Sequence, residues 1–158
     1  MKLLSHFKIS FACLVISIVS SINNRAAAES VIVDIRNTPS DLSAPEMTCE
    51  KPAPGTRSRQ YLSPEHSPDL YYSLYLPTDW TADQQLPLIV EYPGNGPYSN
   101  RLGDTNSGRL EDCNLGYGIT GGKGAIWICL PFVNTETHSH QLQWWGDVEA
   151  TVQYCQQA

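Results

Sequence analysis

The stretch Leu86-Pro87-Leu88-Ile89-Val90-Glu91-Tyr92-Pro93-Gly94-Asn95-Gly96-Pro97-Tyr98 carries the strongest indication of the fold. A short apolar run rich in β-branched residues ends abruptly in Pro-Gly-Asn-Gly-Pro. This pattern predicts a buried strand over 86–92, followed by a loop with little side-chain cover. Open α/β sheets place their ligands at the carboxyl ends of such strands. A tight turn between two strands is the alternative, so the neighbouring elements must decide.

The first 28 residues are organised like a secretory signal peptide. Lys2 and Lys8 precede an uncharged stretch over 9–22, and Ala26-Ala27-Ala28 follows as a small-residue cleavage site. The stretch is shorter than the roughly 20 residues that cross a bilayer. We therefore expect cleavage after Ala28, no stable membrane span afterwards, and a secreted or periplasmic protein. An uncleaved anchor is the alternative.

Charge and cysteine content narrow the class of protein further. The 158-residue chain has a formal net charge of −6, which gives no basis for binding nucleic acid. No C-x-x-C motif occurs, so a zinc ribbon is not supported. An exported chain meets an oxidising compartment, where disulfides form, although the sequence leaves their pairing open. The candidate cysteines are Cys49, Cys113, Cys129 and Cys155.

The remaining chain predicts an α/β fold. Residues 29–69 are rich in proline and polar residues, so we expect an extended leader in which Arg57 and Arg59 are solvated. The predicted domain covers 70–158, with a partial sheet of about three or four strands and one main helix. Strands are expected over 70–77, 86–92 and 124–133, the last two in the centre of the sheet.

The predicted helix covers residues 144–157. Its apolar positions Trp144, Val148, Val152 and Cys155 recur at helical spacing, so we expect this face to pack on the sheet. The glycine-rich connection over 100–124 is expected to be functional or without regular structure. Its glycines precede a strand instead of opening a helix, which argues against a phosphate-binding loop.

The order of these elements resembles the amino-terminal half of an α/β-hydrolase. The stretches 115–124, 126–132 and 143–151 are similar to secreted α/β-hydrolase-like proteins of planctomycete-type genomes. In that family a His-Gly-Gly-Gly loop after the third strand supplies oxyanion-hole N–H groups. The resemblance implies hydrolysis of an ester or related acyl bond, with donors at Gly94, Asn95 and Gly96. Pro93 stands where the family has histidine.

The sequence departs from this family at the catalytic residues. The family's nucleophile lies in Gly-x-Ser-x-Gly, followed by an acid and a histidine. That motif does not occur in this sequence, so no catalytic triad is assigned. We therefore expect a truncated polypeptide that is inactive alone and needs no cofactor. It would act on a small-molecule ester or glycan only in a completed site, for example one assembled with a second polypeptide.

Two other functions remain open from the sequence. One is a non-catalytic exported module that binds carbohydrate or protein through the aromatic residues Tyr71, Tyr72, Tyr75, Trp80, Tyr98, Trp144 and Trp145. The other is a metal site built from His138 and His140 with His66 or Glu136. Histidines in polar loops are usually solvated, so we expect no metal there.

Overall fold

The computed structural model describes residues 35–63, 67–144 and 146–158, so the predicted signal segment lies outside the described residues. The elements are η1 (Ile35–Asn37), β1 (Met47–Thr48), β2 (Arg57–Gln60), β3 (Tyr72–Tyr75), β4 (Leu88–Glu91), β5 (Tyr98–Ser99), β6 (Thr105–Asn106), η2 (Leu110–Asp112), α2 (Leu115–Thr120), β7 (Ile126–Cys129), β8 (Phe132–Asn134), β9 (Ser139–Gln141) and α3 (Val148–Gln157). None of the helices in this part of the chain is long and apolar enough to cross a membrane.

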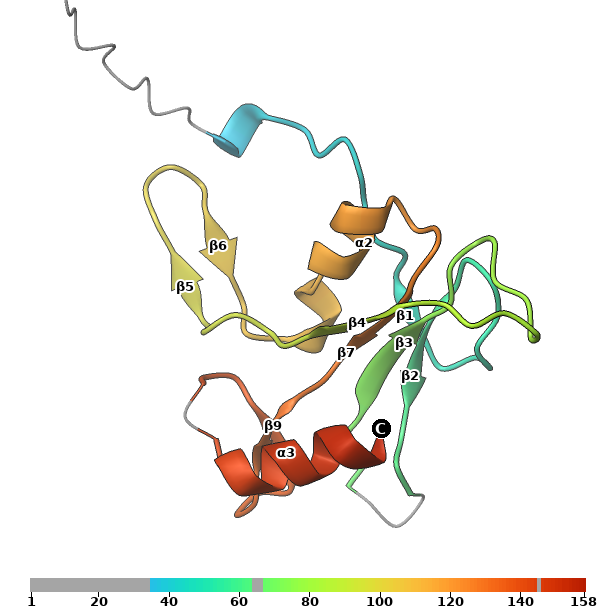
Figure 1. The fold of residues 1–158 in the computed structure, drawn as a ribbon. Coiled ribbons are helices and arrows are strands. Elements are labelled where there is room, and N and C mark those ends of the chain that lie inside the picture. The colour runs from blue at the N-terminus through green and yellow to red at the C-terminus, as the bar shows by residue number, and fades with distance from the viewer. Residues whose placement is uncertain (1–34, 64–66, 145) are drawn as a thin grey trace, which may run out of the picture. The chain divides into compact units, whose positions relative to one another are not determined.

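The main sheet has five strands in the order β1-β2-β3-β7-β4 (Figure 1). β3 runs antiparallel to both of its neighbours, β2 and β7, whereas β4 and β7 are parallel. β7 therefore lies between β3 and β4 although it follows both in the chain. Two small hairpins, β5-β6 and β8-β9, complete the strands of the described residues. The predicted α/β class is confirmed in this broad sense.

Alternation of side chains along β3 and β7 divides the core into two clusters on opposite faces of the sheet. The cluster on the face covered by η2 and α2 contains Tyr71, Tyr75, Leu110, Cys113, Trp127 and Cys129. The cluster on the face covered by α3 contains Leu70, Ile128, Leu130, Val133 and Tyr154. Both faces of β7 are thus buried, as the continuous apolar composition of this strand requires.

The strand expected over 86–92 exists as β4, but its predicted central position is wrong. β4 lies at an edge of the main sheet as described, and β7 is the interior strand beside it, between β3 and β4. Leu88 is 55% exposed and Val90 is 44% exposed, so one face of β4 is largely uncovered by the described part of the chain. An apolar run alone does not distinguish a central strand from an edge strand whose outer side chains are apolar.

The two other predicted strands are present, but their first and last residues differ from those predicted. The strand expected over 70–77 corresponds to β3. The strand expected over 124–133 is divided, because β7 ends at Cys129 and β8 begins only at Phe132. Pro131 lies between them and has no N–H to donate to a ladder.

Residues before 70 also contribute to the sheet. β2 pairs with β3 over its whole length, with Arg57 opposite Tyr75. The expectation that Arg57 is solvated is wrong, because this residue is only 2% exposed. β2 has the sequence Arg-Ser-Arg-Gln and contains no apolar residue. A search for alternating apolar residues therefore could not have identified this strand.

The predicted carboxyl-terminal helix is present as α3, but it buries a different face from the one expected. Val148 is 73% exposed and Val152 is 49% exposed. The buried residues of α3 are Thr151 and Tyr154. The Thr151 hydroxyl accepts a hydrogen bond from the Val133 N–H at 2.9 Å. This polar contact orients the helix on β8, and an apolar pattern does not report it.

The glycine-rich connection is partly regular, since it contains β6, η2 and α2. The Glu91 carboxylate at the end of β4 accepts the N–H groups of Leu115 at 3.3 Å and Gly116 at 3.0 Å. A distant carboxylate thus caps the first turn of α2. Gly116 packs directly against the Trp127 indole, whereas Gly118 has open space where a Cβ would lie.

These two glycines of α2 should respond oppositely to alanine. Gly118→Ala should raise the free energy of unfolding by about 0.5–1 kcal/mol, because alanine loses less backbone entropy in a helix. Gly116→Ala should lower it by about 1–3 kcal/mol, because the new methyl group overlaps the buried Trp127 ring. Urea unfolding of both variants measures the difference, and an equal stabilisation by both would contradict the packing of α2.

Candidate functional site

A cavity of about 860 Å³ opens beside the end of β4. The loop after β4, the β6 hairpin strand, β2 and the η2 segment all contribute to its walls. Charged side chains of both signs line it: Arg57, Arg109, Glu46, Glu91, Glu111 and Asp112. The cavity lies beyond the carboxyl end of this strand, which is where the sequence predicts a ligand site.

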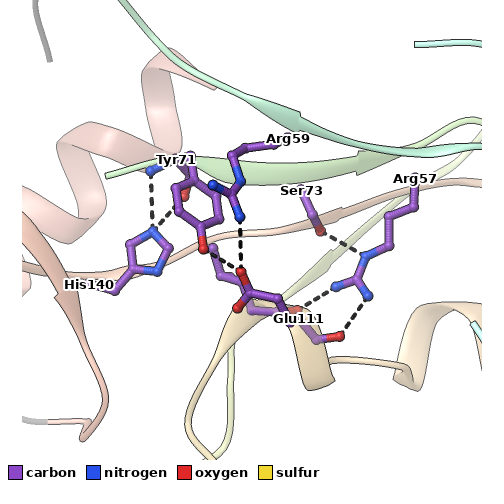
Figure 2. Close-up of polar contacts among 7 residues, drawn as sticks. Arg57, Arg59, Tyr71, Ser73, Glu111 and His140 are labelled. Carbon is purple, nitrogen blue, oxygen red and sulfur yellow. Dashed lines mark hydrogen bonds and ion pairs between the residues drawn. The ribbon is translucent and has the colours of Figure 1, made fainter. Parts of the chain in front are cut away.

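The Arg57 guanidinium is the deepest charged group at this site. It donates to the carbonyl oxygen of Glu111 at 2.9 Å and also to that of Leu110, while its Nε lies 3.4 Å from the Ser73 hydroxyl (Figure 2). Its other contact is with the Trp127 ring, whose centroid lies 4.6 Å from Cζ. Burial lowers the pKa of Arg57 from its ordinary value. β2 is thereby joined to η2 and to β7.

The Glu111 carboxylate forms the second part of the polar network. It accepts hydrogen bonds from the Tyr71 hydroxyl and from Arg59 at 3.4 Å (Figure 2). Arg59 also lies 3.9 Å above the Tyr71 ring centroid. Burial acts to raise the pKa of Glu111, but the Tyr71 hydrogen bond and the Arg59 charge outweigh it, so the net pKa is lowered. Burial and the Glu111 hydrogen bond raise the pKa of Tyr71, which remains a donor at neutral pH.

His140 of β9 closes the network on the other side of Tyr71. The two rings lie 4.3 Å apart, and Nε2 lies 3.0 Å from the Tyr71 carbonyl oxygen and 3.2 Å from its N–H (Figure 2). Burial lowers the pKa of His140, and this outweighs the Tyr71 hydrogen bond and the Glu111 charge, which act to raise it. One nitrogen of the ring is therefore occupied by the main chain of Tyr71.

Of the three histidines in the metal-site hypothesis, the structure describes His138 and His140. His138 is exposed, in a left-handed conformation with φ 50°, and His66 lies outside the described residues. Among residues 35–63, 67–144 and 146–158, no group of three His, Cys, Asp or Glu side chains is placed to hold a metal ion.

The predicted oxyanion loop packs tightly between two other segments. A Cβ at Gly94 would overlap the Asn106 side chain, and one at Gly96 would overlap the backbone of Ser107 and Gly108. On the other side, Asn95 Oδ1 accepts from the Trp144 N–H at 3.3 Å. Packing alone thus requires the glycine at Gly96, whereas a side chain at Gly94 would have to displace that of Asn106.

The N–H groups of this loop differ in their availability. Gly96 donates to the Leu142 carbonyl oxygen at 3.0 Å, so its N–H is occupied. Within the described part of the chain, the N–H groups of Gly94 and Asn95 donate no hydrogen bond. Gly94 also lines the cavity. Two of the three predicted donors therefore remain free to bind an anion.

The aromatic residues of the binding-module hypothesis are dispersed. Tyr71 and Tyr75 are buried in the core, and Tyr72 packs edge-on against Tyr154. Tyr98 and Trp144 are exposed, while Trp145 lies outside the described residues. The buried tyrosines cannot contribute to a binding surface.

The polar network was not predicted from the sequence. Its one local signal is the Arg57-x-Arg59 spacing, which places both arginines on the same face of a strand. Their shared partner Glu111 binds Arg57 through its main-chain carbonyl and Arg59 through its carboxylate, at sequence separations of 54 and 52. The pairing of β2 with β3 and the packing of η2 against β3 bring the network together.

Comparisons of this chain with protein-family models, with curated proteins and with solved structures found no match. Its function is therefore argued from the geometry of the site.

Removal of the buried Arg57 guanidinium should destabilise the folded protein. Arg57→Met should lower the free energy of unfolding by about 2–4 kcal/mol, because it leaves two carbonyl groups of η2 without their donor. The matched control Arg101→Met, at an exposed position, should change it by less than about 0.5 kcal/mol. Urea unfolding measures both values, and similar small effects would contradict the role of Arg57.

His140 should make stability depend on pH. Its folded pKa lies below the ordinary 6.5, so the unfolded chain binds a proton that the folded chain does not. Stability should therefore fall as pH decreases from about 7 through 6.5 and below. The pKa of Glu111 is also lowered by folding, so this carboxylate likewise makes stability fall with decreasing pH, but only below about pH 4.5. Urea unfolding at several pH values should show a smaller loss of stability for His140→Phe than for the unchanged chain as pH falls through about 6.5. Equal slopes in the two proteins would refute this assignment.

Proposed function

We propose that this chain is an exported α/β-hydrolase-type protein, and that the loop after β4 is the anion-binding part of a site for hydrolysis of an ester or related acyl bond. The order of the strands carries this proposal. β7 lies between β3 and β4, it is parallel to β4, and β3 runs antiparallel to its neighbours. In an α/β-hydrolase sheet the fourth strand likewise lies between the second and third, and the second runs antiparallel. The strand order and directions of β2, β3, β4 and β7 match that arrangement.

The proposed chemistry is stabilisation of a developing oxyanion. A tetrahedral intermediate places negative charge on one oxygen, which needs preorganised N–H donors at about 2.7–3.1 Å. The free N–H groups of Gly94 and Asn95 lie just beyond β4, and Gly94 lines the cavity. Gly96 is not part of this proposal, because its N–H is already bound to Leu142.

The family's nucleophile has no counterpart in this sequence. A Gly-x-Ser-x-Gly motif does not occur, and His140 is held against Tyr71. An oxyanion hole without a nucleophile and base leaves only a small residual catalysis. We therefore propose that this polypeptide binds a small-molecule ester or glycan productively only within a completed site, and that it acts in the secreted or periplasmic compartment.

Anion binding at Gly94 and Asn95 can be tested by NMR. A phosphonate monoester carries the tetrahedral geometry and negative charge of the intermediate. On titration with this probe, the amide signals of Gly94 and Asn95 should shift most, while the exposed Gly118 amide should not shift. Asn95→Pro, which removes one N–H group, should weaken binding by about tenfold, the effect of one charge-assisted hydrogen bond of about 1.5 kcal/mol.

Asn95→Ala is the matched control for this experiment. It retains the backbone N–H and removes only the side chain that contacts Trp144, so it should bind the phosphonate as the unchanged chain does. Equal losses in the proline and alanine variants, or shifts confined to Arg57 and Arg109, would refute the oxyanion site.

A further inference from the structure

Cys113 and Cys129 lie in direct contact inside the core. Cys113 follows η2, and Cys129 is the last residue of β7; both are buried. Their Sγ atoms are 2.7 Å apart. Non-bonded heavy atoms rest at roughly 3.5–4.0 Å, whereas a disulfide bond measures about 2.0 Å. The two sulfur atoms are therefore already closer than non-bonded packing permits.

We propose that Cys113 and Cys129 form a disulfide bond in the folded, exported protein, and that Cys49 and Cys155 remain outside it. Cys49 is exposed near β1. Cys155 lies on α3 and packs against the cluster on the opposite face of the sheet from Cys129. The sheet thus separates Cys155 from the proposed pair. The sequence left all pairings open, and this contact selects one.

The step is a two-electron oxidation by thiol–disulfide exchange. The thiolate of one cysteine attacks the disulfide of an oxidant, either a thiol–disulfide oxidoreductase of the exporting compartment or oxidised glutathione, and one thiol leaves. The second thiolate then displaces the other thiol from the mixed disulfide. Two protein thiols lose two protons and two electrons, and the oxidant is reduced to two thiols. Supply of the oxidant in the cell rests on the proposed export.

Burial determines when this bond can form. Burial raises the pKa of the Cys129 thiol, so few thiolates are present in the folded core. Oxidation should therefore precede the enclosure of β7 during folding. Once formed, the bond is shielded from reductants by the same packing.

The bond has a direct consequence for the candidate site. Cys113 lines the cavity and stands two residues after Glu111, whose carbonyl accepts from Arg57. A covalent link to β7 would hold this wall of the cavity on an interior strand of the main sheet. The closed loop spans a sequence separation of 16, for which loop-closure entropy predicts a thermal midpoint roughly 10 °C higher in the oxidised protein.

Mass spectrometry of the full chain tests the pairing. The protein is refolded in a glutathione redox buffer, blocked with N-ethylmaleimide in denaturant, and digested with chymotrypsin. Trypsin is unsuitable because no Lys or Arg follows Lys123, so Cys129 and Cys155 would share one peptide. We expect a cross-linked peptide pair containing Cys113 and Cys129, with Cys49 and Cys155 alkylated. Complete alkylation, or a cross-link to another cysteine, would overturn the proposal.

Variants separate the effect of this bond from general effects of reduction. Refolding in dithiothreitol, which keeps both thiols reduced before the core encloses them, should lower the thermal midpoint of the unchanged chain and of Cys155→Ala by roughly 10 °C relative to the oxidised protein. It should leave that of Cys113→Ala unchanged, and a retained shift there would count against the pair. If Cys113→Ala does not fold, the cross-linked peptides found by mass spectrometry decide by themselves whether Cys113 and Cys129 are paired. Because the oxidant is supplied in the buffer, the result does not depend on export or on the oxyanion site.

Discussion

The buried guanidinium of Arg57 is the contact on which the candidate site depends. A charge taken out of water is costly unless hydrogen bonds compensate it. Here the compensation comes from the carbonyl groups of Leu110 and Glu111 and from the face of Trp127. Since Arg57 lies on β2, η2 has to sit against the sheet where its carbonyl groups reach the guanidinium. That placement brings the Glu111 carboxylate to Tyr71 and Arg59, and it forms one wall of the cavity.

The loop after β4 satisfies two requirements with the same residues. Gly96 is needed because the backbone of Ser107 and Gly108 lies where its side chain would be, and a side chain at Gly94 would have to displace that of Asn106. This packing also occupies the N–H of Gly96 through Leu142, but leaves those of Gly94 and Asn95 free. A glycine pair in such a loop is therefore not by itself a sign of anion binding. The distinction depends on which N–H groups already have partners.

Much of the regular structure was predictable, and two of the failures share one cause. The apolar runs correctly indicated β3, β4 and β7, and the helical spacing indicated α3. β2 was missed because Arg57 and Arg59 make a strand without apolar residues. The buried face of α3 was predicted wrongly because the Thr151 hydroxyl, bound to Val133, orients the helix. In each case a polar side chain is buried by hydrogen bonds to distant backbone, which hydrophobic periodicity does not register.

Local patterns along this chain were sufficient to place three strands, one helix and a glycine loop at a strand end. They were sufficient because the side-chain periodicities of strands and helices act over a few residues. The order of the strands, the edge position of β4, the burial of Arg57 and the contact between Cys113 and Cys129 appeared only in the folded chain. These features depend on surfaces that are distant in sequence and meet only when the sheet assembles, so no short stretch of residues contains them.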